Sequence, residues 1–229
     1  MKSDMFLEVL RAISEYPLKV LDVPNTGDNY VAIDLSETNN ALNKVDLTCS
    51  KNFSEFIKDY LKINHAKVAF GGYLEHRNLY RRSIHFNQKN EETERNIHLG
   101  IDLWCDEKTG VVSVLDGKVH SYKNNANFGD YGPTIILEHE VNNFSFYTLY
   151  GHLSLDSLSK WHVGTTVKQG EVIGYLGSSE VNGDYPPHLH FQLINDLQGF
   201  SGDYVGVCNK KDLEFYKINC PDPNVLLNL

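Results

Sequence analysis

PTIILEHEVNNFSFYTLYGHL, residues 133–153, contains two apolar runs on either side of a pair of asparagines. Both runs are rich in β-branched or aromatic residues, which favour strands, and the polar pair between them is typical of a turn. Similar runs separated by Gly, Asn or Asp recur along the chain: GVVSVLDGKVHSY (110–122), TTVKQGEVIGYLG (165–177) and PHLHFQLI (187–194). This pattern predicts a mainly β domain, an antiparallel sheet or sandwich built from hairpins.

The start of the chain has a different pattern. MKSDMFLEVLRAISEYP (1–17) suggests a first helix that ends before Pro17. A second helix is expected in SKNFSEFIKDYLKIN (50–64), with Ser50 as its N-cap. Its apolar face at helical spacing contains Phe53, Phe56, Ile57, Tyr60 and Leu61. We therefore divide the chain into an N-terminal helical segment, residues 1–66, and a β domain, residues 67–229.

Length and net charge limit the number of domains and the kinds of binding partner that we expect. The 229 residues fit one large domain or one domain with an added segment. A net charge of −9 argues against nucleic-acid binding and against adhesion to anionic membranes. Arg77, Arg81 and Arg82 form the densest basic cluster, which we interpret as a solvated loop, with binding of a carboxylate or phosphate as the alternative.

The N-terminal residues lack the continuous apolar stretch of roughly 7–15 residues that a secretory signal needs. No run approaches the roughly 18 apolar residues of a membrane span. We therefore expect a cytoplasmic protein if Met1 is the native start, and an extracellular or periplasmic one if the sequence is trimmed. The cysteines form no CxxC pair, and we expect free thiols at Cys49, Cys105, Cys208 and Cys220.

RNIHLGIDLW, residues 95–104, alternates apolar residues with His98, Gly100 and Asp102. His98 and Asp102 share one face of an extended chain. In a straight strand they lie about 13 Å apart, which is too far to bind one metal ion. Gly100 lies midway and can permit the bend that brings them together. A polar strand end is the alternative for Asp102.

Three other histidines occupy patterned positions. In PHLHFQL, His188 and His190 share one strand face, so both can approach one site, and two unpaired imidazoles would be costly to bury there. Two half-buried sheet histidines are the alternative. His152 follows an apolar strand and a glycine, at a strand end where loops often build sites.

His139 begins HEVNN, which fails the HExxH zinc-protease motif at Asn143, and we assign it a structural role. HVGTTVKQGEVIGYLG also looks like the hairpins of biotinyl or lipoyl domains, but no carrier-lysine motif is present. We interpret its glycines as turn residues.

Taken together, HLGID, YTLYGHL, GEVIGYLGS and PPHLHFQL resemble the M23 (lysostaphin/LytM-type) zinc metallopeptidases. The motifs appear in that family's order, HxxxD, then YxH, then HxH, and cover roughly residues 95–195. GGYLEHRNLYRRS and CPDPNVLLNL look like the M23-type domain found alone or fused to aminotransferase-like and kinase-like domains in some bacteria.

The resemblance implies a β metallopeptidase domain with an open groove and one Zn²⁺. By position, His98, Asp102 and His190 match the zinc ligands, and His152 and His188 match the two catalytic histidines. Tyr150 points toward the groove or packs in the sheet.

The function implied is a zinc metalloendopeptidase that hydrolyses peptide bonds, in peptidoglycan-type stem or cross-bridge peptides, with zinc-activated water. Its partner is then a peptide or a peptidoglycan-derived substrate. Two alternatives stay open: a zinc-stabilised, non-catalytic binding or regulatory module, and a zinc amidase acting on an intracellular substrate.

Overall fold

A computed structural model describes residues 2–229 except residues 25, 27, 83–89 and 91. Strands dominate the described residues, which confirms the mainly β prediction. The helices are α1 (Lys2–Ile13), α2 (Ser50–Ile63), α3 (Leu213–Asn219) and α4 (Asn224–Leu227), with 3₁₀ turns at Asn40–Lys44, Asn78–Arg82 and Leu155–Leu158. The strands are β1 (Tyr30–Ala32), β2 (Val68–Gly71), β3 (Ile97–His98), β4 (Ile101–Trp104), β5 (Gly110–Val112), β6 (Gly117–Asn125), β7 (Gly132–Val141), β8 (Phe144–Gly151), β9 (Thr166–Val167), β10 (Val172–Tyr175), β11 (His188–Ile194) and β12 (Val207–Cys208).

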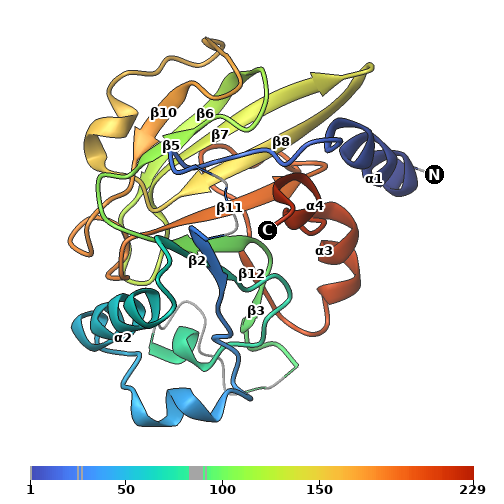
Figure 1. Ribbon diagram of the computed structural model, residues 1–229. Helices are drawn as coiled ribbons and strands as arrows, with labels where there is room; N and C mark the ends of the chain where they lie inside the picture. Colours follow the sequence, from blue (N-terminus) through green and yellow to red (C-terminus); the bar gives the residue numbers. More distant parts are fainter. Residues whose placement is uncertain (1, 25, 27, 83–89, 91) are drawn as a thin grey trace.

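Within the described residues, eight strands form one sheet in the order β1-β2-β4-β11-β8-β7-β6-β9 (Figure 1). Neighbouring strands are antiparallel, except for the parallel pair β1 and β2. Two separate ribbons pair β5 with β10 and β3 with β12. The quoted hairpin is β7–β8, with Val141 opposite Phe144 across the predicted asparagine turn.

The two faces of the central strands have different roles. On β11, Leu189, Phe191 and Leu193 enter the large hydrophobic core. Because side chains alternate along a strand, the histidines at 188 and 190 point to the opposite face. The metal-ligand candidates therefore lie on the far side of the sheet from its main core.

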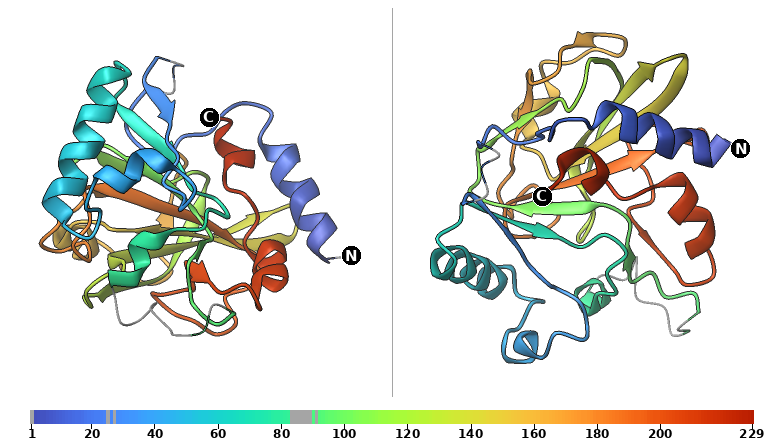
Figure 2. Two further views of the ribbon diagram at one scale, coloured as in Figure 1. Left: turned by 90° about the horizontal axis from the view of Figure 1, so that it is seen from below. Right: turned by 45° about the vertical axis from the view of Figure 1, so that its right-hand side comes forward.

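The N-terminal residues pack against the same sheet. On α1, Phe6 contacts Phe144 and Phe146 of β8, each at a ring-centroid distance of 5.4 Å. On α2, Phe53 contacts Trp104 of β4 at 5.0 Å. The two helices lie on opposite sides of the molecule (Figures 1 and 2).

Both predicted helices are confirmed, but the expected N-cap of the second is displaced by one residue. Cys49 is the extended residue before α2 and makes no side-chain cap, so Ser50 is already helical. The predicted apolar face is confirmed, since Phe53 and Ile57 are buried and its other members pack beside them.

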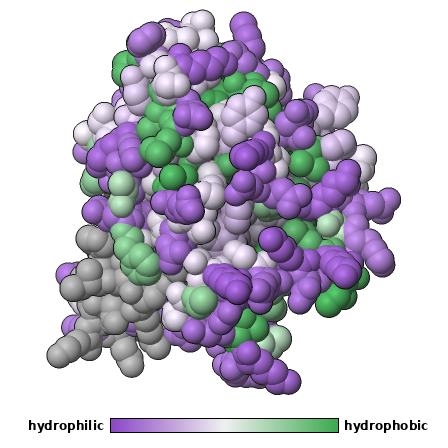
Figure 3. Space-filling model, turned by 90° about the vertical axis from the view of Figure 1, so that its left-hand side faces the viewer, coloured by the Kyte–Doolittle hydropathy of each residue, from purple (hydrophilic) through white to green (hydrophobic). Residues whose placement is uncertain are grey.

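The visible surface is largely polar. The face seen in Figure 3 is mostly hydrophilic, with hydrophobic side chains at scattered positions. Among the described helices, none is long and apolar enough to cross a membrane. The four cysteines are free thiols, as expected.

Candidate metal centre

A break between β3 and β4 places His98 beside Asp102. The strand is interrupted at residues 99 and 100, so the chain bends where Gly100 was expected to permit it. A Cβ on Gly100 would lie 2.6 Å from Cε1 of His190 and 2.7 Å from the carbonyl of Phe191. Glycine at this position therefore also lets the two ligand-bearing segments approach each other.

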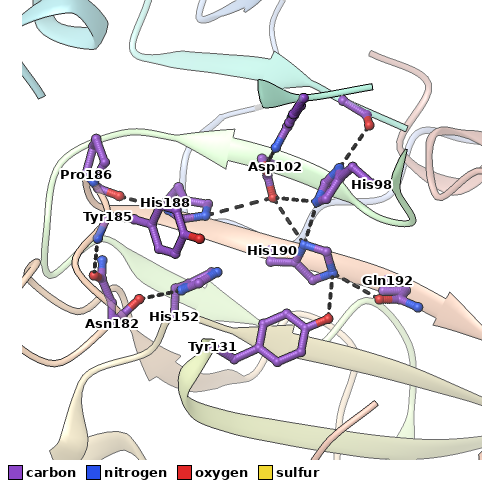
Figure 4. A network of polar contacts seen from close by, with 12 residues as sticks. His98, Asp102, Tyr131, His152, Asn182, Tyr185, Pro186, His188, His190 and Gln192 are labelled. Carbon is purple, nitrogen blue, oxygen red and sulfur yellow. Dashed lines mark hydrogen bonds and ion pairs between the residues drawn. The ribbon is translucent and has the colours of Figure 1, made fainter. Parts of the chain in front are cut away.

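β11 brings the other histidines to the same place. It lies between β4 and β8, with His190 opposite both Asp102 and Gly151. His98, Asp102, His152, His188 and His190 are each no more than 5% exposed. All five site residues predicted from the sequence therefore meet in one buried cluster (Figure 4).

Three potential ligand atoms converge within this cluster. Nε2 of His98 lies 2.8 Å from Nδ1 of His190, and Oδ1 of Asp102 lies 3.3 Å from the first and 3.2 Å from the second. Bonds of about 2.1 Å to a tetrahedral zinc ion require ligand atoms about 3.4 Å apart. The three atoms therefore have nearly the spacing that one zinc ion needs.

The outer hydrogen bonds identify the tautomers. Nδ1 of His98 donates to the carbonyl of Gly72 at 2.9 Å, because a carbonyl can only accept, and Nε2 is left unprotonated. The side-chain amide of Gln192 donates to the carbonyl of Val205, so its Oε1 accepts from Nε2 of His190 at 3.0 Å. In the neutral form of His190 the lone pair is then on Nδ1.

In these neutral tautomers two nitrogen lone pairs and a carboxylate oxygen face one another. Such an arrangement of acceptors is repulsive unless a cation lies among them. The donor set of two imidazoles and one carboxylate suits zinc and leaves one coordination position open. The residues present therefore fit a metal ion.

His152 and His188 are oriented in the same way as His98. Nδ1 of His152 donates to the carbonyl of Asn182 at 2.7 Å, and Nδ1 of His188 donates to that of Pro186 at 2.8 Å. Both Nε2 atoms are left as proton acceptors, and that of His188 lies 3.9 Å from Oδ1 of Asp102. The two rings pack with centroids 4.1 Å apart and a tilt of 32° between their planes.

The protein environment keeps these imidazoles neutral. Burial lowers the pKa of His98 and of His188 to about 4, although the Asp102 charge opposes the shift. Burial and the neighbouring His188 hold the pKa of His152 well below its usual value. Burial alone would raise the pKa of Asp102, but His98 and the Arg77 guanidinium hold it well below its usual range. At neutral pH His98 therefore offers a neutral nitrogen and Asp102 an ionised carboxylate, as metal binding requires.

Tyr150 is a core residue. It is fully buried, accepts from the backbone N–H of Val114 at 3.0 Å and packs on Phe191. His152 has φ of +62°, in the left-handed region, so the alternation of β8 does not continue to it. Tyr150 and His152 therefore lie in different environments, and the packed-aromatic interpretation holds.

For Arg77, the solvated-loop interpretation is wrong. Its side chain is 2% exposed and pairs with the carboxylates of Asp102 and Glu75. The side chains of residues 81 and 82 lie outside the described set.

His139 has the structural role that we assigned to it, since it is buried and bonded to the carbonyl of Asp116 and to Thr148.

Several residues around the cluster were missed by sequence reasoning. The Tyr131 hydroxyl lies 3.4 Å from Nε2 of His190, and Trp104 stacks on His188 with centroids 3.9 Å apart. A cavity of about 220 Å³ opens beside the cluster, lined by aromatic residues that include Tyr80, Tyr131, Tyr185 and Trp104. For Gln192 a signal exists, because it continues the alternation of 188 and 190 on the same strand face.

Residues 96–203 match the model of peptidase family M23. Among solved structures, the chain is similar to the catalytic domain of the antimicrobial peptidase lysostaphin from Staphylococcus simulans, at 24% identity over 68% of this chain and 96% of that one, with a TM-score of 0.39. It is similar to a zinc-containing peptidase from Vibrio cholerae, at 29% identity over 47% of this chain and 30% of that one, with a TM-score of 0.35. It is also similar to a mutant catalytic domain of the prophage-encoded M23 protein EnpA from Enterococcus faecalis, at 20% identity over 54% of this chain and 90% of that one, with a TM-score of 0.37. No curated protein matches the chain significantly.

Proposed function

Residues 96–203 match the model of peptidase family M23, and on this premise we propose that the protein is a zinc-dependent metalloendopeptidase. Its proposed substrates are stem or cross-bridge peptides of the peptidoglycan type. The observation that carries the proposal is the convergence of Nε2 of His98 and Nδ1 of His190 with one oxygen of Asp102, at 2.8–3.3 Å from one another.

Nε2 of His98, Oδ1 of Asp102 and Nδ1 of His190 would hold the ion. When bound there, zinc would acidify a water molecule and polarise the carbonyl of the scissile peptide bond. The ligands are preoriented by their outer contacts, because Gly72 fixes the ring of His98 and Gln192 fixes that of His190.

His152 and His188 would handle the proton. Each presents an unprotonated Nε2, because each Nδ1 donates to a backbone carbonyl. The rings are 4.1 Å apart, so a charge on one opposes a charge on the other and the pair takes up one proton at a time. The protonated ring becomes a hydrogen-bond donor that stabilises the oxyanion and then returns the proton to the leaving amine.

Oδ1 of Asp102, 3.9 Å from Nε2 of His188, favours the protonated form of that ring. His188 is therefore the better candidate for the base that accepts the proton of the attacking water. His152 can donate to the oxyanion only when its own Nε2 carries the proton, so in this assignment it is the second proton acceptor of the pair. The left-handed backbone at His152 supports a functional role for it, because such conformations are uncommon for residues other than glycine.

The test is a mass-spectrometric digest of cross-linked peptidoglycan and of small peptides that contain glycine and D-amino acids. Zinc-loaded wild-type protein is expected to release stem or cross-bridge peptides. His190→Ala removes a ligand and is expected to lose both zinc and activity. His188→Ala is expected to keep zinc and to lose about 10²- to 10⁴-fold in turnover, the usual contribution of general acid–base catalysis.

His162→Ala serves as the matched control, because His162 is exposed. It is expected to change neither zinc content nor turnover. Loss of zinc in His188→Ala would show that the ligand and base assignments are wrong. Zinc binding by the wild type without turnover of any peptide in the panel would contradict the endopeptidase proposal.

A further inference from the structure

The segment from Gly71 to Tyr80 lies outside the residues that match the peptidase family, yet it borders the metal centre. β2 pairs with β4 so that Gly71 lies opposite Asp102. The chain then turns back, and the N–H of Arg77 donates to the carbonyl of Asn96 at 2.9 Å. This path carries the side chain of Arg77 to the carboxylate of Asp102.

Arg77 joins two buried or nearly buried carboxylates. Its Nη1 donates to Oδ2 of Asp102 at 2.5 Å, and its Nε donates to Oε2 of Glu75, also at 2.5 Å. The side chains of Arg77 and Asp102 are 2% and 3% exposed. Oε1 of Glu75 accepts from the N–H of Leu35 at 2.9 Å, which ties the group to the N-terminal part of the chain.

Gly72 makes room for this arrangement. A Cβ at residue 72 would lie 1.9 Å from Nη2 of Arg77, and the φ of +104° also disfavours other residues. The carbonyl of the same residue accepts from Nδ1 of His98. One glycine therefore fixes a ligand imidazole and admits the guanidinium that holds the ligand carboxylate.

We propose that Arg77 is a positioning residue of the metal centre, acting as a permanent counter-ion for Asp102. Its hydrogen bond occupies Oδ2 of that carboxylate and directs Oδ1 alone toward the ligand nitrogens of His98 and His190. The site is thereby preformed in the metal-free chain. This inference rests on the metal site of the proposed function.

The charges at the site indicate whether Arg77 stabilises the metal-free or the zinc-loaded protein more. Without a metal, Arg77 is, among the side chains that the structure describes, the permanently charged cation that contacts the buried Asp102 carboxylate, and its removal leaves that charge uncompensated. With zinc bound, the ion itself compensates the carboxylate and repels the guanidinium. Arg77 therefore stabilises the metal-free fold more than the loaded one.

Thermal unfolding with and without zinc tests the proposal. Arg77→Met is expected to lower the Tm of the metal-free chain by on the order of 10 °C, and to lower that of the zinc-loaded chain by less than half as much. Arg77→Met combined with Asp102→Asn removes both charges and is expected to recover part of the metal-free loss. Arg77→Lys keeps the charge without the two-pronged geometry and is expected to lie between wild type and Arg77→Met.

Lys217→Met is the matched control, because Lys217 is a surface cation paired with Glu214 at 3.1 Å. It is expected to change the Tm by the same small amount with and without zinc. Equal losses for Arg77→Met in both forms, or strictly additive losses in the double variant, would overturn the role of Arg77. A wild-type chain that binds no zinc would instead contradict the proposed function, and the double variant would still measure the coupling between Arg77 and Asp102 in the metal-free chain.

Discussion

At the scale of single residues, the site depends on which nitrogen of each histidine carries the hydrogen. Backbone carbonyls accept from Nδ1 of His98, His152 and His188, and each ring therefore presents Nε2 to the cluster. His190 is reversed, because its Nε2 donates to Gln192 and its Nδ1 faces the other ligands. The hydrogen-bond acceptors around the cluster therefore determine which ring nitrogen of each histidine presents its lone pair to the site.

Gln192→Leu removes the acceptor that orients His190. The ring then loses its tautomer preference, and we expect zinc affinity to fall by about 10- to 100-fold, as is usual when a partner of a metal ligand is lost. Competition with a chromogenic chelator measures the change. Gln169→Leu, at an exposed position, is the control. Unchanged zinc affinity in a folded Gln192→Leu protein would show that the Tyr131 hydroxyl, 3.4 Å away, is sufficient to orient the ring.

At the scale of secondary-structure elements, breaks in the strands place the ligands as much as the strands do. The interruption at residues 99 and 100 brings His98 and Asp102 together, and the positive φ of His152 turns it out of the alternation of β8. The long hairpin β7–β8 keeps a continuous register from Val141↔Phe144 to Ile135↔Tyr150. Regular strand pairing thus fixes the positions of the strands, and local irregularities in the backbone determine where the side chains of the site point.

The β7–β8 turn allows a direct test of its backbone geometry. Asn142 and Asn143 have φ of +52° and +61°, as a two-residue hairpin turn of the primed type requires. Asn143→Ala is expected to cost about 1 kcal/mol of unfolding free energy, because alanine resists positive φ, and Asn143→Gly is expected to cost less. Denaturant unfolding of the two variants checks this. Equal losses would assign the effect to the asparagine side chain.

At the scale of the whole molecule, the N-terminal residues share the core of the sheet. Phe6, Leu10 and Leu21 belong to the same buried cluster as Leu137 and Phe191. Residues 30–32 add a parallel strand beside β2. The division of the chain at residue 66 stays a prediction, as does the cytoplasmic location, and within the described residues the two segments pack against each other.

The stability of the whole fold is expected to depend on pH through His139. Burial lowers the pKa of His139 to about 4, against about 6.5 in an unfolded chain. Between these values the unfolded chain binds the extra proton, so stability is greatest above pH 6.5 and falls as the pH drops toward 4. The loss attributable to this residue is on the order of 3 kcal/mol.

Metal-free His139→Asn keeps a side-chain donor near the position of Nδ1 and cannot titrate in this range. Its unfolding free energy is expected to fall less steeply between pH 6.5 and 4 than that of the wild type, and urea titrations at several pH values measure the slope. The exposed His162→Asn is the control and is expected to keep the wild-type slope. An unchanged slope in His139→Asn would place the acid sensitivity in other histidines.

Much of the fold, and the residues of the candidate ligand set, could be predicted from patterns among neighbouring residues in the sequence. Alternation along residues 187–194 predicted which side chains face the core, the spacing in residues 50–64 predicted α2, and the spaced motifs predicted His98, Asp102 and His190. The ligand roles stay a proposal. The strand and helix predictions succeeded because strand and helix periods are properties of neighbouring residues. They need no knowledge of which strand lies beside which.

The tertiary structure alone decided the surroundings of the ligands. Arg77 meets Asp102 across 25 positions of sequence, and Tyr131 meets His190 across 59. Both contacts depend on strand order and register, through β2 beside β4 and β11 beside β8. Sequence by itself determined the strand and helix pattern and the candidate metal-binding residues, because residue types and local spacing carry both. Only the tertiary structure determined the charge balance and tautomers, because these depend on long-range packing that brings distant polar groups within hydrogen-bond distance.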